Sequence, residues 1–421
     1  MCPLTTGGTA SNIAPGDICA TNWDAVLELA GRAGQVFVAG FGEPFCNSRC
    51  IEFLRELDAR GVKTSLVTNG VAVTPSRAAE IASIQSIEHI NVSIDSPDAD
   101  CYRSIRGGRL DQALRGLANV LAAIDDPLRV SVSSVAMSTN VRTLVSFPPL
   151  LESMGVRNYI IQGLWDYNDY CLDSRLSGDR ELKGILGGVV ADGARRGIDV
   201  QLTLGDRSIT ELDQPELAAQ RYYVPGSTEP ARTRQCMLPW ELPYVDKDGR
   251  VFSCCYAASV GSPELGRMEK STFDEIWNGS PYSQFRRELV GGNSMPGVCR
   301  GCTAVPLGPH PLSLYSGRLE SVAVDGPGRL RVAVRNTGSV PWELGSVLIG
   351  TCRPRDRRSP AADPSWIREN RPCTFDEPRV PPGEVATFSF PVAMMPDGKT
   401  AHFAVVVEHV CWLPTTEFSL P

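Results

Sequence analysis

Two hydrophobic periods alternate along the first half of the chain. Between residues 22 and 204, stretches with apolar residues three or four positions apart alternate with short, nearly continuous apolar runs. The first pattern predicts amphipathic helices and the second predicts buried strands. Helices are expected at 22–33, 48–61, 76–84, 110–124, 141–155 and 180–197, and strands at 35–40, 62–70, 88–95, 128–137, 156–163 and 198–205. Strands that alternate with helices across short loops predict an α/β fold with a parallel sheet, curled into a barrel or left open.

The pattern changes twice after this α/β region, which we take as 1–204. Residues 205–233 are polar and rich in Pro, Glu and Gln, which is typical of a linker. Residues 234–306 form a small cysteine-rich region with a hairpin signal, "DKDG", and a helical stretch. Residues 312–421 alternate apolar and polar positions between Gly, Pro and Asn turns, which predicts an all-β sandwich.

Three tryptophans of the last region are expected to pack in the core or at the edge of the sandwich. The alternative is an aromatic surface that binds sugars. The residues are Trp342, Trp366 and Trp412.

Composition excludes some classes of protein. The net charge of −7 gives no reason to expect binding to nucleic acid or to an anionic membrane. No apolar run is long enough for a membrane-spanning helix, and the chain does not open on the basic and apolar segments of a signal peptide. We therefore expect a cytoplasmic protein with no membrane partner. Its 14 cysteines and four scattered histidines predict a metal site built from thiolates, which favour iron–sulfur clusters or zinc.

Small and polar residues follow three successive predicted strands. The first strand runs into "GFGEP" at 40–44, the second ends in "TNG" at 68–70, and the third ends in "SIDS" at 93–96. Each tripeptide alone is typical of a turn. The carboxyl ends of parallel strands meet at one edge of a sheet, so together these groups predict a ligand site for hydroxyls and amines.

A second set of cysteines lies in the hairpin region. The hairpin carries Cys236 before it and Cys254 and Cys255 after it, and "CRGC" supplies Cys299 and Cys302. Four thiolates from a hairpin and a CxxC pair suit either tetrahedral zinc or a fully ligated iron–sulfur cluster. Coordination chemistry alone does not choose between them.

Residues 1–204 resemble radical S-adenosylmethionine (radical SAM) enzymes. "AGFGEP" is similar to the GGEP motif of that family, with Phe41 in place of one glycine, and "NVSIDSPDADCYRSIRGG" is similar to its segment at and after strand four. The resemblance implies a partial (β/α) barrel that binds S-adenosylmethionine and a [4Fe–4S] cluster with one open iron. It also implies a set of residues that bind the cofactor: Gly42, Glu43, Pro44, Ser93 and Asp95.

The N-terminus resembles the end of the family's CxxxCxxC motif. Cys2 stands in the context "MCP", like the third cluster ligand, so we expect the reading frame before Met1 to encode the first strand and the other two cysteines. Cys46 and Cys50 have CxxxC spacing, but Phe53 occupies the third position, and we expect both to be ordinary cysteines. The alternative is a degenerate protein that lacks the SAM cluster.

The cysteine-rich region resembles the auxiliary-cluster domain of radical SAM proteins, called SPASM, in its shortened twitch form. The resemblance implies one auxiliary [4Fe–4S] cluster for electron transfer. Its ligands would be Cys236, Cys254, Cys299 and Cys302. Cys254 is preferred to Cys255 because it follows Gly249 by the family's spacing. Both are expected at the end of the returning strand, where neighbours point to opposite faces, so only one of them can be a ligand without a bulge. The last region resembles Ig-like sandwich modules.

These resemblances predict a radical SAM oxidoreductase. It would generate a 5′-deoxyadenosyl radical and abstract hydrogen from a small polar or carbohydrate-like molecule, or from a peptide. Substrate is expected against "QGLWDYNDY", with Gln162, Trp165 and Asp166 in contact, and electrons are expected from a flavodoxin or ferredoxin. Two other hypotheses remain open: a degenerate scaffold that binds through its β-sandwich, and a zinc-ribbon protein.

Overall fold

The computed structural model describes residues 22–40, 42–164, 180–203, 233–291, 296–302, 310–326, 328–353, 355–395 and 399–420, with 174, 176 and 307–308. Its first part is a six-stranded parallel sheet in the order β1-β2-β3-β4-β5-β6. The strands are β1 (Gln35–Val38), β2 (Lys63–Thr68), β3 (Ile87–Ser93), β4 (Val130–Ala136), β5 (Asn158–Gly163) and β6 (Asp199–Thr203). Strands that pair in chain order confirm the predicted α/β fold.

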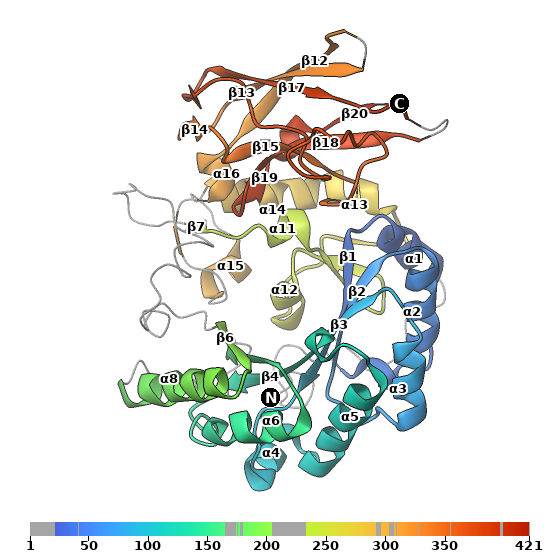
Figure 1. The fold of residues 1–421 in the computed structure, drawn as a ribbon, viewed down its shortest axis with the longest axis vertical. Helices are drawn as coiled ribbons and strands as arrows, with labels where there is room; N and C mark the ends of the chain where they lie inside the picture. The colour runs from blue at the N-terminus through green and yellow to red at the C-terminus, as the bar shows by residue number, and fades with distance from the viewer. Residues whose placement is uncertain are drawn as a thin grey trace.

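Helices connect these strands and lie together outside the curved sheet (Figure 1). They are α1 (Trp23–Gly31), α2 (Cys50–Ala59), α3 (Pro75–Ala82), α4 (Ala99–Arg106), α5 (Leu110–Ala123), α6 (Phe147–Met154) and α8 (Arg180–Arg195). Alternate strand residues such as Leu66, Val92 and Val132 pack against helical residues such as Leu54 and Leu117 in one buried core. The opposite face, which we call the inner face, carries polar residues.

The cysteine-rich region folds as a small mixed domain. Its elements are β7 (Thr233–Arg234), α11 (Leu238–Glu241), β8 (Tyr244–Val245), β9 (Arg250–Phe252), α12 (Cys255–Ser259), β10 (Gly266–Arg267), α13 (Phe273–Asn278), α14 (Ser280–Gly291), α15 (Gly297–Gly301) and β11 (Leu307–Gly308). The predicted hairpin is β8–β9, and its turn closes through Gly249 with φ of +71°. The single predicted helix is divided at Gly279, whose extended backbone ends α13, and whose Cβ, if present, would lie 2.6 Å from the Glu275 carbonyl oxygen.

The C-terminal region is all-β, as predicted, after the short helix α16 (Pro311–Leu314). One antiparallel sheet pairs β12 (Gly317–Val324), β13 (Arg329–Asn336) and β17 (Val385–Pro391). A second pairs β15 (Val347–Thr351), β18 (Ala401–Val407), β19 (Cys411–Trp412) and β20 (Phe418–Leu420), and β14 (Trp342–Glu343) pairs with β16 (Arg379–Val380). Strands of both sheets share one apolar core. The three tryptophans are at most 8% exposed, so the packing interpretation is confirmed.

The small domain lies between the α/β domain and the β-sandwich (Figure 1). Ala25 and Leu29 of α1 pack against the core of the small domain, and Arg32 forms a two-bonded ion pair with Asp274 at 2.8 and 2.9 Å. The sandwich also touches the α/β domain directly, through Arg357. None of the described helices is both long and apolar enough to cross a membrane.

Candidate functional site

The loop after β1 needs glycine for its backbone and leaves open space beside it. Gly40 and Gly42 have φ values of +144° and +122°, which side-chain-bearing residues rarely adopt. A Cβ on Gly40 would lie 2.7 Å from the hydroxyl of Tyr244, which reaches over from the small domain. Apart from its two chain neighbours, no described residue has an atom within 4 Å of where a Cβ on Gly42 would stand. A ligand can therefore approach the backbone at Gly42.

The Glu43 carboxylate is fixed against the end of β2. Its Oε1 accepts a hydrogen bond from the Thr68 hydroxyl at 2.6 Å, and its Oε2 accepts one from the Asn69 amide at 2.7 Å. Pro44 begins a short 3₁₀ turn directly after it. A carboxylate has about four acceptor positions, so Glu43 retains acceptors for a ligand's amine. The structure thus brings together two of the sequence signals, "GEP" and "TNG".

Ser93 and Asp95 differ in what they leave for a ligand. Ser93 is half-buried on the inner face, and its hydroxyl is 3.4 Å from that of Ser133. Asp95 is 1% exposed and bonded internally: Oδ2 accepts from Arg106 Nε at 2.5 Å and Oδ1 accepts from the Val135 amide at 2.8 Å. Asp95 therefore connects α4 to the end of β4, two residues after Ser93 along the chain.

A ladder of polar side chains crosses the inner face between β3 and β4. His89 Nε2 and Asn91 Nδ2 lie 2.8 and 2.7 Å from the Ser131 hydroxyl, and the Ser133 hydroxyl donates to Asn91 Oδ1 at 2.6 Å. Burial lowers the pKa of His89. This ladder was not predicted from the sequence, although polar residues at every second position of β3 and β4 indicate a shared polar face. We call these residues, with Ser93, the inner-face ladder.

The predicted substrate residues divide between described and undescribed parts of the chain. Gln162 is exposed at the end of β5 and stands in register with Val135 and Thr203, so it shares the inner face with the ladder. Trp165 and Asp166 lie outside the described residues, as does Cys2.

Three of the predicted cluster thiols influence one another. Burial, with smaller contributions from Cys254 and Cys302, raises the pKa of Cys236 to about 12. The Cys254 Sγ accepts a hydrogen bond from the Ala257 amide at 3.4 Å. Cys299 lies on α15, and Cys302 is the residue that caps the end of this helix. Among the residues that the structure describes, no three His, Cys, Asp or Glu side chains surround a common metal-sized point.

The chemistry of these thiols fits a metal cluster. A half-buried thiol loses its proton readily only when a cation stabilises the thiolate. Amide N–H groups directed at sulfur, from Ala257 to Cys254 and from Leu238 to Cys236, are the outer interactions that tune iron–sulfur clusters. Sulfur donors, burial and N–H···S bonds therefore agree with such a group.

Cys254 and Cys255 do not lie on the returning strand, so the prediction of their position was wrong. We expected both at the end of the returning strand, on opposite faces. In the structure β9 ends at Phe252, Cys254 caps α12 in an extended conformation, and Cys255 is the first helical residue. The two side chains diverge because the helix begins between them.

The earlier pair, Cys46 and Cys50, lies in two different environments. Cys50 is 6% exposed in the core beneath α2, and burial raises its pKa to about 12. Cys46 is exposed. Their interpretation as ordinary cysteines stays a prediction.

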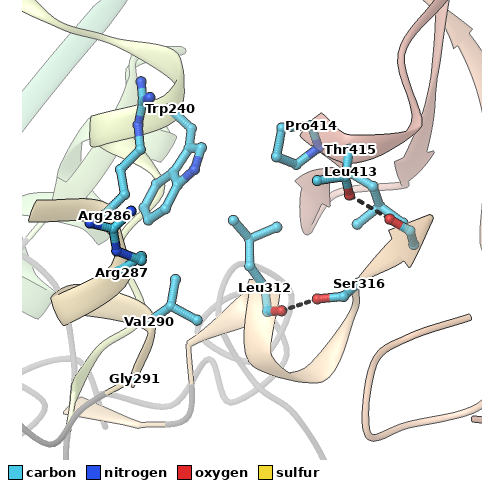
Figure 2. Close-up of a pocket in the computed structure, with 11 residues that line it drawn as sticks. Trp240, Arg286, Arg287, Val290, Gly291, Leu312, Ser316, Leu413, Pro414 and Thr415 are labelled. Atoms are coloured by element: carbon cyan, nitrogen blue, oxygen red, sulfur yellow. Dashed lines mark hydrogen bonds between the residues drawn. The ribbon is translucent and has the colours of Figure 1, made fainter. Parts of the chain in front are cut away.

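A pocket of about 400 Å³ lies apart from the strand ends (Figure 2). Figure 2 shows Trp240 and Arg286 on one wall and Leu312 and Leu413 on the other. None of the residues that line it belongs to the α/β domain. The pocket therefore marks the seam between α14 and the β-sandwich and is separate from the site at the strand ends.

Comparison with known proteins identifies two domains. Residues 20–142 match the family model of the radical SAM superfamily, and residues 236–303 match that of the SPASM iron–sulfur cluster-binding domain.

Two relatives align over most of the chain. The PqqA peptide cyclase of Gluconobacter oxydans is 24% identical over 310 residues, which cover 72% of this chain and 78% of that protein. The mycofactocin maturase MftC of Mycolicibacterium smegmatis is 26% identical over 274 residues, 64% of each chain.

Among solved structures, Streptococcus suis SuiB bound to its precursor peptide SuiA superposes with a TM-score of 0.50 at 13% identity. The superposition covers 67% of this chain and 63% of SuiB. At this identity the similarity shows a common fold.

Proposed function

Because this chain belongs to the radical SAM superfamily and carries a SPASM domain, we propose that it modifies a peptide by radical chemistry. The two domains imply S-adenosylmethionine and [4Fe–4S] clusters as cofactors. When bound, these cofactors supply a 5′-deoxyadenosyl radical that abstracts hydrogen from the substrate. The peptide is proposed because one relative is a cyclase of the PqqA peptide and a structure with the same fold holds a precursor peptide.

The observation that carries the proposal is the Glu43 carboxylate, which is fixed at the end of β2 beside Gly42. Thr68 and Asn69 orient Glu43, whose remaining acceptors suit the methionine amine of S-adenosylmethionine. The described residues leave the space beside Gly42 open to the cofactor, and Pro44 stiffens the loop at this point. A carboxylate held by two hydrogen bonds needs no reorganisation when an ammonium group arrives.

Ribose hydroxyls would meet Ser93 at the end of β3. Its hydroxyl can donate one hydrogen bond and accept others. Among the described residues, its one side-chain hydrogen-bond partner is the Ser133 hydroxyl. We assign Asp95 a positioning role here, because both of its oxygens are bonded to Arg106 and Val135.

The inner face suits a peptide. Within the inner-face ladder, His89 and Ser93 are half-buried, and their imidazole and hydroxyl groups can pair with peptide N–H and C=O groups. Asn91, Ser131 and Ser133 are buried and hold these two side chains in place. Gln162 and Thr203 add exposed polar groups at the far strands, and Phe37 is 50% exposed on the same face. We propose that Trp165 and Asp166 complete this surface. A small polar molecule would leave much of it unused.

In the small domain we propose Cys236, Cys254, Cys299 and Cys302 as ligands of one auxiliary cluster. Burial of the thiols excludes water from the cluster, and the N–H···S bonds stabilise negative charge on its sulfurs. We propose electron transfer as its role, with a flavodoxin or ferredoxin as donor to the protein.

The test measures cleavage of S-adenosylmethionine under reducing, anaerobic conditions. The protein is extended at its N-terminus to carry the complete CxxxCxxC motif expected from the sequence, and a variant without those cysteines is the control. We expect 5′-deoxyadenosine from the extended protein and none from the control. Fully loaded clusters without cleavage would instead support the degenerate scaffold.

Within this assay, Ser93→Ala should weaken binding of S-adenosylmethionine. A buried polar contact is worth ~1–3 kcal/mol, which corresponds to about tenfold to a hundredfold in affinity. Unchanged cofactor affinity in Ser93→Ala would contradict a role of Ser93 in binding the cofactor.

Asp166→Ala should leave uncoupled cleavage of S-adenosylmethionine intact and lower turnover of the substrate.

A further inference from the structure

The segment that carries Cys236 is anchored in the neighbouring domain. Met237, the next residue, is 8% exposed and belongs to the buried core of the β-sandwich. Trp240, on the same short helix α11, packs against that core as well. The backbone beside a proposed cluster ligand therefore takes its position from the β-sandwich.

His310 makes the direct connection. It is fully buried at the start of α16, and its Nε2 lies 2.8 Å from the carbonyl oxygen of Cys236. Its Nδ1 accepts a hydrogen bond from the Leu312 amide at 3.2 Å. An amide N–H can only donate, so Nδ1 is unprotonated and the proton of the neutral ring is on Nε2, which donates to Cys236. Burial lowers the pKa of His310 to about 4, which agrees with a neutral ring.

Two arginines hold the rest of the segment. Arg286 of α14 donates from Nε and Nη2 to the Pro239 carbonyl oxygen at 3.0 and 2.9 Å. Arg355 of the sandwich pairs with Glu241 at 3.4 Å. Trp240 also packs against the His310 ring, with ring centroids 5.0 Å apart and the ring planes at 49°. Three separate elements therefore fix a segment of six residues.

We infer that His310 is a positioning residue for the auxiliary cluster, and that the β-sandwich supports a cluster ligand through it. The hydrogen bond to the Cys236 carbonyl fixes the peptide that presents the ligand sulfur and the Leu238 N–H directed at it. The inference rests on the proposed assignment of Cys236 as a ligand. Loss of such an outer interaction commonly costs about tenfold to a hundredfold in metal affinity.

The experiment compares loss of iron from anaerobically reconstituted variants challenged with a chelator. His310→Phe keeps an aromatic ring against Trp240 and removes both hydrogen bonds. His310→Gln keeps a donor of similar reach toward Cys236. His402→Phe, near the start of β18, is the matched control, because the half-buried His402 ring also makes a side-chain hydrogen bond, to Ser419. Cys236→Ala shows which iron belongs to the auxiliary cluster.

We expect His310→Phe to lose the auxiliary-cluster iron about tenfold to a hundredfold faster than the wild type. His310→Gln and His402→Phe should remain close to the wild type. The electron paramagnetic resonance signal of the reduced cluster should change in His310→Phe and return in His310→Gln, a rescue that lost packing would not produce.

If His310→Phe fails to fold, His310→Asn replaces it, since Asn can still accept from the Leu312 amide but is too short to reach Cys236. Wild-type retention and signal in the Phe or Asn variant, with iron lost in Cys236→Ala, would overturn the role of His310. Full retention of cluster iron in Cys236→Ala would overturn the ligand assignment itself.

Discussion

Thr68 decides the orientation of Glu43 at the scale of single residues. Its hydroxyl donates to Glu43 Oε1 at 2.6 Å and accepts from the Gly70 amide at 3.0 Å, so it links the β2 turn to the carboxylate. Thr68→Val has nearly the same shape and removes both bonds. We expect affinity for S-adenosylmethionine to fall about tenfold, which corresponds to ~1.4 kcal/mol.

Equilibrium binding of S-adenosylmethionine to the reconstituted protein measures this effect. Thr68→Ser keeps the hydroxyl and is the control, with near-wild-type affinity expected. Equal affinities for Thr68→Val and Thr68→Ser would show that Glu43 binds the cofactor without help from Thr68, or does not bind it.

At the scale of elements, a single glycine lets α5 reach the strand ends. A Cβ on Gly116 would stand 1.8 Å from the carbonyl oxygen of Gly70, in the turn that follows Thr68. Gly116→Ala must therefore move either the helix or the turn, and overpacking of this kind costs ~1–3 kcal/mol. We expect a lower urea midpoint and, because the strained contact is with the turn that follows Thr68, weaker binding of S-adenosylmethionine.

Gly188→Ala is the matched control on α8. Gly188 is exposed, and a Cβ there meets no atom within 4 Å. Alanine in an exposed helix interior is favoured over glycine by about 0.5–1 kcal/mol, so this variant should raise the midpoint. A Gly116→Ala protein as stable as the wild type would contradict the close contact of α5 with the turn.

At the scale of the whole molecule, Arg357 joins the β-sandwich to the α/β domain. Its Nη1 and Nη2 donate to the carbonyl oxygens of Gly61 and Gly34 at 3.0 and 2.8 Å. The ion pair between Arg32 and Asp274 joins α1 to the small domain, but both side chains are about half exposed, and such pairs contribute at most ~1 kcal/mol. Of these two polar links to the α/β domain, the one made by Arg357 is therefore the stronger.

Arg357→Met keeps the aliphatic stem and removes both hydrogen bonds. We therefore expect the free energy that stabilises this domain contact to fall by ~1–3 kcal/mol. Hydrogen exchange should become faster in segments 33–36 and 60–63, while the sandwich core keeps its protection. Arg358→Met, at the exposed neighbour, should leave exchange unchanged. Wild-type exchange in Arg357→Met would show that apolar packing alone holds the two domains together.

Much of this architecture was predictable from local patterns. The alternation of helical and strand periods predicted the six parallel strands and their places along the chain, because burial of one helix stripe and one sheet face imposes its period directly on the sequence. The order in which these strands pair came from the structure. The motif around Glu43 and the thiols of the small domain were also legible, since their chemistry depends on residue type and spacing. The division at Gly279 and the start of α12 after Cys254 were missed, because such breaks depend on tertiary packing.

The sequence by itself therefore determined the fold class, the order of the domains and the residue types that carry the chemistry. Only the tertiary structure decided which of these residues meet. It directed Asp95 to Arg106, aligned the inner-face ladder across β3 and β4, and set His310 against the carbonyl of Cys236, 74 residues away. Hydrogen bonds need partners within about 3 Å, and over such separations that distance is set by strand register and domain packing, which no local pattern records.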